Sequence, residues 1–270
     1  MTSGFRVLDD GRRDGATNMA VDESLLDAYA SATAPAEPTL RLYGWRPPAL
    51  SLGRRQPASA AHDPSFLARN GIDLVRRPTG GRAVLHEHEL TYAVAGRLAT
   101  PPFRKGVLDT YATIAGAIAA ALRAIGVAAD AAPAERAGAR DPGPFGPPVC
   151  FDRAGPHEIV VEGRKLVGSA QVRRRGAFLQ HGSILLRADP ARLAGAVGAA
   201  DDAPRLVDLE TALGRAPDER RLRAALRAAF EEALGLPSFD GELTAGEARE
   251  SARLRAEKYA TAAWTLHGRP

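Results

Sequence analysis

Apolar and polar residues alternate over several short segments of the chain and recur with helical spacing over others. Alternation predicts a strand at residues 39–45, and strand-like segments predict further strands at residues 5–8, 74–77, 83–95, 157–161, 165–172 and 177–186. Helical spacing predicts helices at residues 18–30, 108–127, 218–234 and 245–264, with the whole region after residue 190 helical. We expect the turn Thr79–Arg82 to join two neighbouring strands and the last three strands to form a meander. The pattern predicts an α+β fold of mixed β-sheets flanked by helices, because strands and helices do not alternate regularly.

A segment rich in proline and glycine interrupts this pattern at residues 131–148 and predicts a long surface loop. The chain of 270 residues is long enough to bury a sizeable core. We therefore expect a single domain over residues 1–270, with a core at about 17–190 and a helical C-terminal region at about 190–270.

Composition narrows the classes of function. A net charge of +4 and a pI near 9.6 favour acidic partners. Nucleic acid is not favoured, because the arginines are scattered and aromatic residues make up 6% of the chain. The sequence contains no apolar run of the roughly 18 residues that span a bilayer and no secretory signal at its start, so no membrane association and a cytoplasmic location are expected.

The turn Thr79-Gly80-Gly81 lies between Arg76 and Arg77 on one side and His86 on the other. A glycine pair is compatible with a plain hairpin turn, where glycine adopts positive φ at little cost. It is equally compatible with a loop whose backbone N–H groups approach an acyl carbonyl or a phosphate. His86 and His88 are two residues apart, so they face the same side of the predicted strand, but no third metal ligand is evident beside them. We therefore expect packed or hydrogen-bonded histidines and predict no metal site.

Cys150 is the single cysteine and follows the proline- and glycine-rich segment. Such a residue can be a small buried apolar side chain, or a nucleophile delivered into a cleft. A thiol with a pKa of about 8.5 is mostly protonated at neutral pH and needs a nearby cation to become reactive. Lys165 is a candidate for that cation, although a solvated lysine in a hairpin fits the same position.

Several segments occur together and in order along the chain. They are NMAVDESLL, LRLYGWRPPALSLGRRQ, VRRPTGGRAVLHEHELTYAV, PVCF, VEGRKLVGSAQVRRRGAFLQHGSILL and EKYATAAWT. With them the chain resembles the biotin/lipoate protein ligase superfamily, and most closely the cysteine-type octanoyltransferases related to lipoate–protein ligase A. The resemblance implies a biotin/lipoate ligase-like catalytic domain.

The resemblance also implies an active site. Cys150 would be the nucleophile that forms an acyl-thioester, and Lys165 would lie beside it and lower the pKa of its thiol. The residues implied to bind the acyl substrate are Arg76, Arg77, Thr79, Gly80, Gly81, His86, Gly168, Ser169, Ala170, His181 and Gly182. No cofactor and no metal are implied. Arg82 stands where many ligases of the superfamily have glycine.

The implied reaction moves an octanoyl group from octanoyl-acyl carrier protein to a lysine of a lipoyl-domain acceptor protein, such as the glycine-cleavage H protein or a dehydrogenase E2. A monomer is implied. Two related activities remain open: an ATP-dependent lipoate–protein ligase, and an octanoyl amidotransferase that takes the acyl group from the H protein. A basic nucleic-acid-binding protein without catalysis is the alternative from another class.

Overall fold

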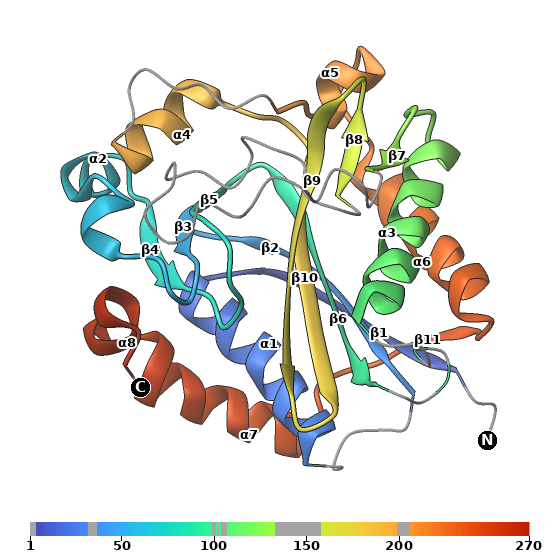
Figure 1. The fold of residues 1–270 in the computed structure, drawn as a ribbon, viewed down its shortest axis with the longest axis horizontal. Helices are drawn as coiled ribbons and strands as arrows, with labels where there is room; N and C mark the ends of the chain where they lie inside the picture. The colour runs from blue at the N-terminus through green and yellow to red at the C-terminus, as the bar shows by residue number, and fades with distance from the viewer. Residues whose placement is uncertain are drawn as a thin grey trace.

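The computed structural model describes residues 4–31, 37–98, 101, 103, 107–132, 158–198 and 206–269. A mixed eight-stranded sheet forms its centre, with helices on both faces and a smaller three-stranded sheet beside it (Figure 1). This arrangement confirms the predicted fold class. Cys150 and most of the proline- and glycine-rich segment lie outside the described residues.

The large sheet runs antiparallel except at one edge, where β1 lies parallel to both of its neighbours. In spatial order its strands are β11 (Ser238–Asp240), β1 (Phe5–Arg13), β2 (Thr39–Trp45), β6 (Glu89–Arg97), β10 (Ala177–Leu185), β9 (Arg164–Arg174), β8 (Ile159–Val161) and β7 (Asp130–Ala131). The predicted meander is confirmed, since β8, β9 and β10 pair in chain order.

Helices cover the two faces of this sheet because its strands bury side chains on both sides. On one face lie α1 (Gly15–Ala30) and α7 (Ala245–Leu254), packed on residues such as Tyr43 and Leu179. On the other face lie α3 (Val107–Ala124) and α6 (Glu219–Leu234), packed on Leu42 and others (Figure 1). Neighbours such as Leu42 and Tyr43 face opposite layers, as alternation along a strand requires.

The small sheet and its helices form a third cluster. Its strands are, in spatial order, β4 (Asp73–Arg76), β3 (Ala49–Leu52) and β5 (Val84–His86). The helices α2 (Pro64–Arg69) and α4 (Pro190–Val197) share a core with it. The remaining elements are the short 3₁₀ helix η1 (Ala58–Ala60), α5 (Leu209–Leu213), the π-helical turn η4 (Arg255–Tyr259) and α8 (Ala262–His267).

Three predicted elements differ from the structure. The segment 83–95 is not one strand, because β5 pairs in the small sheet and β6 in the large one. The strands on either side of the Thr79–Arg82 turn do not pair with each other, since β3 lies between β4 and β5. The segment 245–264 is not one helix but α7, η4 and the start of α8, and the C-terminal region also contributes the strand β11.

Candidate active site

A pocket lies between the two sheets and α1. Seven residues predicted to bind substrate line it: Arg77, His86, Gly168, Ser169, Ala170, His181 and Gly182. The rest of its lining consists of Met19, Tyr43, Trp45, Val84, Thr91 and Ser183. Apolar, aromatic and very small side chains with a few polar groups suit a slender aliphatic ligand.

The wall formed by β9 and β10 depends on Gly182. A Cβ atom at this position would lie 2.5 Å from the carbonyl oxygen of Gly168 and 2.8 Å from Oγ of Ser169. The neighbouring strand closes the same wall, since the Tyr92 hydroxyl and Ser169 Oγ are 2.7 Å apart. A residue with a side chain at Gly182 would therefore force the strands apart or fill the pocket.

His181 is held at both ring nitrogens. Its Nδ1 lies 2.8 Å from Oδ2 of Asp22, and its Nε2 lies 2.7 Å from Oγ1 of Thr79. Since an ionised carboxylate can only accept, Nδ1–H donates to Asp22 and the Thr79 hydroxyl donates to Nε2. This assigns one tautomer to His181 and ties the Thr79–Arg82 turn to the pocket.

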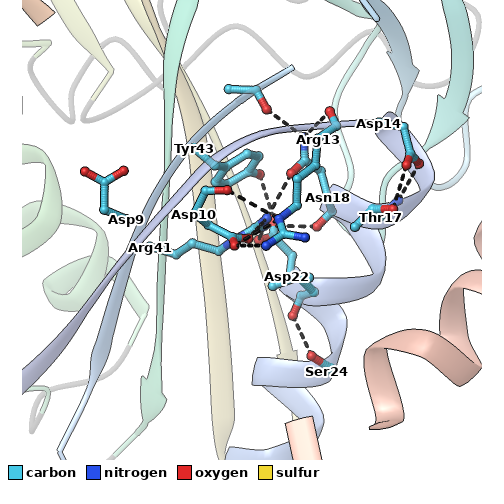
Figure 2. Close-up of polar contacts among 12 residues, drawn as sticks. Asp9, Asp10, Arg13, Asp14, Thr17, Asn18, Asp22, Ser24, Arg41 and Tyr43 are labelled. Atoms are coloured by element: carbon cyan, nitrogen blue, oxygen red, sulfur yellow. Dashed lines mark hydrogen bonds and ion pairs between the residues drawn. The ribbon is translucent and has the colours of Figure 1, made fainter. Parts of the chain in front are cut away.

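Asp22 is the centre of a buried polar network (Figure 2). Arg41 donates to its Oδ1 at 2.7 Å and the Tyr43 hydroxyl donates to its Oδ2 at 2.9 Å. Arg41 also donates to Asp10 at 2.6 Å, so one guanidinium joins two carboxylates. Arg41 and Asp22 are both 0% exposed, which makes their pairing necessary.

The network sets the charges beside the pocket. Burial favours the neutral form of Asp22, but its hydrogen bonds to His181 and Arg41 hold the pKa of this carboxyl below its ordinary value. Burial lowers the pKa of His181, and its contact with Asp22 only partly offsets this, so the ring is neutral at pH 7. Burial and the Asp22 carboxylate both raise the pKa of Tyr43, so its hydroxyl stays a donor.

His86 lies under Trp45, with ring centroids 3.9 Å apart and planes 14° from parallel. Its Nδ1 is 2.6 Å from Oε1 of Glu89, and its Nε2 is 2.6 Å from Oγ of Ser51. Arg77 donates to the same Ser51 oxygen at 2.7 Å, and Nδ1–H of His86 donates to the Glu89 carboxylate, which can only accept. The predicted hydrogen-bonded histidine is therefore confirmed.

Glu89 anchors the strand beneath His86. Its Oε1 also accepts from the hydroxyls of Thr91 at 2.5 Å and Ser183 at 2.8 Å. The other carboxylate oxygen, Oε2, is buried without a hydrogen-bond partner among the described residues. One oxygen thus gathers three donors and fixes the polar end of the pocket.

The adjacent arginines Arg76 and Arg77 point to different places. Arg77 lines the pocket and donates to the carbonyl oxygens of Gly80 at 3.0 Å and Arg82 at 2.8 Å. Arg76 instead donates to carbonyl oxygens of the 53–56 turn and of α8, and it does not line this pocket.

The glycine turn adjoins the pocket lining but does not itself line the pocket. Thr79 reaches the pocket through its bond to His181, while Gly80 and Gly81 are exposed. Gly81 has φ +90°, and its carbonyl oxygen would be 1.8 Å from a Cβ atom at Gly53. Gly53 and Gly81 therefore permit a close backbone crossing between the turns 53–56 and 79–82.

Lys165 lies on β9, on the same strand as the wall residues 168–170, and is 2% exposed. Its Nζ donates to Oε1 of Glu158 at 2.5 Å. The alternative interpretation, a solvated lysine in a hairpin, is therefore wrong, because the side chain is buried in an ion pair. Its predicted proximity to Cys150 involves a residue outside the described part of the chain and stays a prediction.

Two further observations bear on the site. Within the residues that the structure describes, no three His, Cys, Asp or Glu side chains gather as metal ligands. Over the same residues, no helix combines the length and the apolar content needed to cross a membrane.

Sequence reasoning missed the residues that support the pocket from behind, chiefly Asp22, Arg41, Ser51 and Glu89. Each belongs to a predicted helix or strand or to the short segment that follows one, where a polar residue is usually placed on the exposed side. One signal for this support was available at Arg41. Residues 39, 41 and 43 share one face of the predicted strand, so a buried face there would also bury the arginine.

The fold agrees with comparisons to known proteins. A family model described as the lipoyl protein ligase A/B catalytic domain matches residues 14–231, and the chain belongs to this family. Among curated relatives, octanoyltransferase LipM of Kyrpidia tusciae is 41% identical over 270 residues, covering 96% of this chain and 97% of the relative. Octanoyltransferase LipM of Symbiobacterium thermophilum is 39% identical over 280 residues, covering 98% and 99%.

Solved structures share the fold. Lipoate-protein ligase A bound with ATP superposes with a TM-score of 0.79 at 24% identity, covering 98% of this chain and 99% of that one. A bi-partite lipoate protein ligase from Thermoplasma acidophilum gives a TM-score of 0.78 at 23% identity, covering 98% and 97%. At these identities the likeness establishes the fold alone.

Proposed function

We propose that the protein is an octanoyltransferase, an acyltransferase that moves an octanoyl group from a carrier-bound thioester to a lipoyl-domain lysine. The observation that carries this proposal is the 41% identity to octanoyltransferase LipM of Kyrpidia tusciae over 96% of the chain. The pocket supports it, because predicted substrate-binding residues from three separate segments meet there. The ligase and the H-protein amidotransferase alternatives are not favoured, since the curated relatives are named octanoyltransferases.

The reaction would proceed in two steps through Cys150. Its thiolate attacks the carbonyl carbon of octanoyl-acyl carrier protein, the carbon–sulfur bond to the carrier breaks, and the carrier leaves as a thiol after taking up a proton. The amine of the acceptor lysine then attacks the enzyme thioester. An amide bond forms, the bond between the acyl carbon and the Cys150 sulfur breaks, and the proton lost by the amine passes to that sulfur.

Residues around the pocket have defined parts in this proposal. The eight-carbon chain would occupy the space framed by Gly168, Ser169 and Gly182. Lys165 would stabilise the Cys150 thiolate, with Glu158 holding its ammonium group in place. The acceptor would be the glycine-cleavage H protein or a dehydrogenase E2. The enzyme would act as a single catalytic domain, as a monomer and in the cytoplasm.

Intact-protein mass spectrometry tests the first step. The enzyme is mixed with octanoyl-acyl carrier protein without ATP, beside a Cys150→Ala variant. We expect a mass gain of one octanoyl group on the wild type alone, released by hydroxylamine. A separate mixture of enzyme, lipoate and ATP tests the ligase activity. Lipoate-dependent consumption of ATP there, with no adduct on Cys150 in the first mixture, would instead support the ligase.

A further inference from the structure

Arg76 connects two parts of the chain that are far apart in sequence. Its side chain is buried under the turn of residues 53–56 and the C-terminal end of α8, which lies beside β4 (Figure 1). The guanidinium donates to the carbonyl oxygens of Gly53 at 2.7 Å, Arg54 at 3.2 Å, Gln56 at 2.7 Å, Trp264 at 3.0 Å, Thr265 at 3.1 Å and Leu266 at 3.3 Å. The turn and the helix end are thus held together as one surface.

The charge of Arg76 is not cancelled by a carboxylate. All of its partners are carbonyl oxygens, and it forms no ion pair within the described residues. Burial lowers its pKa, but a guanidinium stays protonated in proteins. A buried cation therefore adds positive potential to the surface above it.

The turn itself presents two more cations. Arg54 and Arg55 are exposed, and neither side chain forms a hydrogen bond or an ion pair in the part of the chain that the structure describes. Their backbone is fixed, because Arg54 N–H donates to the Thr79 carbonyl oxygen at 2.8 Å. Thr79 in turn holds His181 of the pocket, so this surface is rigidly joined to the pocket wall.

The helix end adds an apolar contact. Leu266 is 39% exposed and is one of two large apolar side chains, with Phe239, that stand out in this way among the described residues. Its backbone adjoins the arginine turn, since Arg76 donates to the carbonyl oxygens of both Leu266 and Arg54. We call Arg54, Arg55 and Leu266 the arginine surface.

We propose that the arginine surface docks the acyl donor, an acidic carrier protein that brings the octanoyl thioester to the pocket. This inference rests on the proposed function and names the partner of that same site. Unpaired guanidiniums around an apolar side chain match an acidic partner that buries one apolar contact. An acceptor whose lysine arrives as an ammonium group fits a surface of unpaired arginines less well, because like charges repel.

The test compares the variant Arg54→Gln/Arg55→Gln with the wild type. The control is Arg215→Gln/Arg220→Gln, which removes two exposed arginines that also form no ion pair or hydrogen bond in the described residues. These control residues lie at and just before α6, on the opposite face of the large sheet. Binding of fluorescently labelled octanoyl-acyl carrier protein is measured by anisotropy, and the rate of enzyme acylation by mass spectrometry.

We expect the double variant to lose roughly tenfold in affinity and in acylation kcat/KM at low salt, with the control unchanged. The difference should shrink as the screening length falls from about 30 Å at 0.01 M salt to about 8 Å at 0.15 M. Acylation by the small uncharged donor S-octanoyl-N-acetylcysteamine should be the same in all three proteins.

Other outcomes would overturn the proposal. Equal carrier binding by wild type and variant would remove the docking role, and equal slowing with the uncharged donor would place the arginines in the chemistry of the pocket. Slower transfer from pre-acylated enzyme to the lipoyl domain, with normal acylation, would assign the surface to the acceptor. If no thioester acylates even the wild type, the proposed function fails, while the binding measurement still decides the docking question.

Discussion

Replacing Arg41 with methionine should destabilise the protein by about 3–5 kcal/mol, the usual cost of leaving a buried charge without its partner. The guanidinium is 0% exposed and bridges Asp22 at 2.7 Å and Asp10 at 2.6 Å. Methionine keeps much of the apolar volume, so the loss reports on charge more than on packing. His181 and Tyr43 would remain as hydrogen-bond donors to Asp22, but both are neutral.

The loss should depend on pH in a defined direction. In the folded wild type the pKa of Asp22 lies below its ordinary value of about 3.9, which the unfolded chain keeps. The stabilising contribution of Asp22 is therefore complete above about pH 3.9 and is lost as pH falls from there through the lower pKa of the folded protein. Without Arg41, burial would dominate and raise the pKa of Asp22 in the folded variant. Protonation would then relieve the penalty, and the difference between the two proteins should narrow between pH 7 and pH 5.

Urea denaturation followed by circular dichroism at pH 7 and pH 5 measures both effects. Arg13→Met serves as the control, because Arg13 is 46% exposed and its pair with Asp10 should contribute less than about 1 kcal/mol. A loss below about 1 kcal/mol for the Arg41 variant, or an equal loss at both pH values, would refute the electrostatic account.

Three other outcomes are expected. Arg76→Met should lower the free energy of unfolding by at least about 3 kcal/mol in urea denaturation, because six carbonyl oxygens lose their donor. Hydrogen exchange should show α8 losing protection first, and full protection of α8 would contradict this. Gly182→Ala should cost about 1–3 kcal/mol and slow octanoyl transfer, because its methyl group would lie 2.5 Å from the Gly168 carbonyl oxygen, whereas Gly116→Ala in α3 meets nothing within 4 Å and should be tolerated. Since burial lowers the pKa of His181, the unfolded state takes up a proton more readily, and stability should fall as pH drops below about 6.5; His181→Gln should weaken this dependence in pH-dependent thermal unfolding.

The periodic pattern located most elements but not their partners. The segment 83–95 reads as one continuous strand in the sequence, yet Leu85 pairs with Leu50 in the small sheet while Leu90 pairs with Ile184 in the large one. Alternation records which face a side chain takes and carries no information about which strand lies beside it. The last predicted helix is interrupted by the π-helical turn Arg255–Tyr259, and within this turn Tyr259 donates to Glu23 of α1 at 2.6 Å, a tertiary contact that the periodic pattern does not record.

For the site, the resemblance located the pocket lining better than it located the support behind it. Seven of the eleven residues predicted to bind substrate line the pocket. Arg76 was grouped with Arg77 because they are adjacent in a motif, although neighbouring residues on a strand face opposite sides. The motifs do not identify Asp22 and Glu89 as support residues, since their roles come from hydrogen bonds to His181 and Ser183, which are 159 and 94 positions away.

The position of Arg76 has a consequence for folding during translation. Its carbonyl partners at Trp264, Thr265 and Leu266 are translated some 190 residues after it, the first of them 188 positions later. A nascent chain that already holds every residue lining the pocket would still carry a buried cation with three of its six carbonyl partners missing. We therefore expect the region around Arg76 to complete its folding only once α8 has left the ribosome.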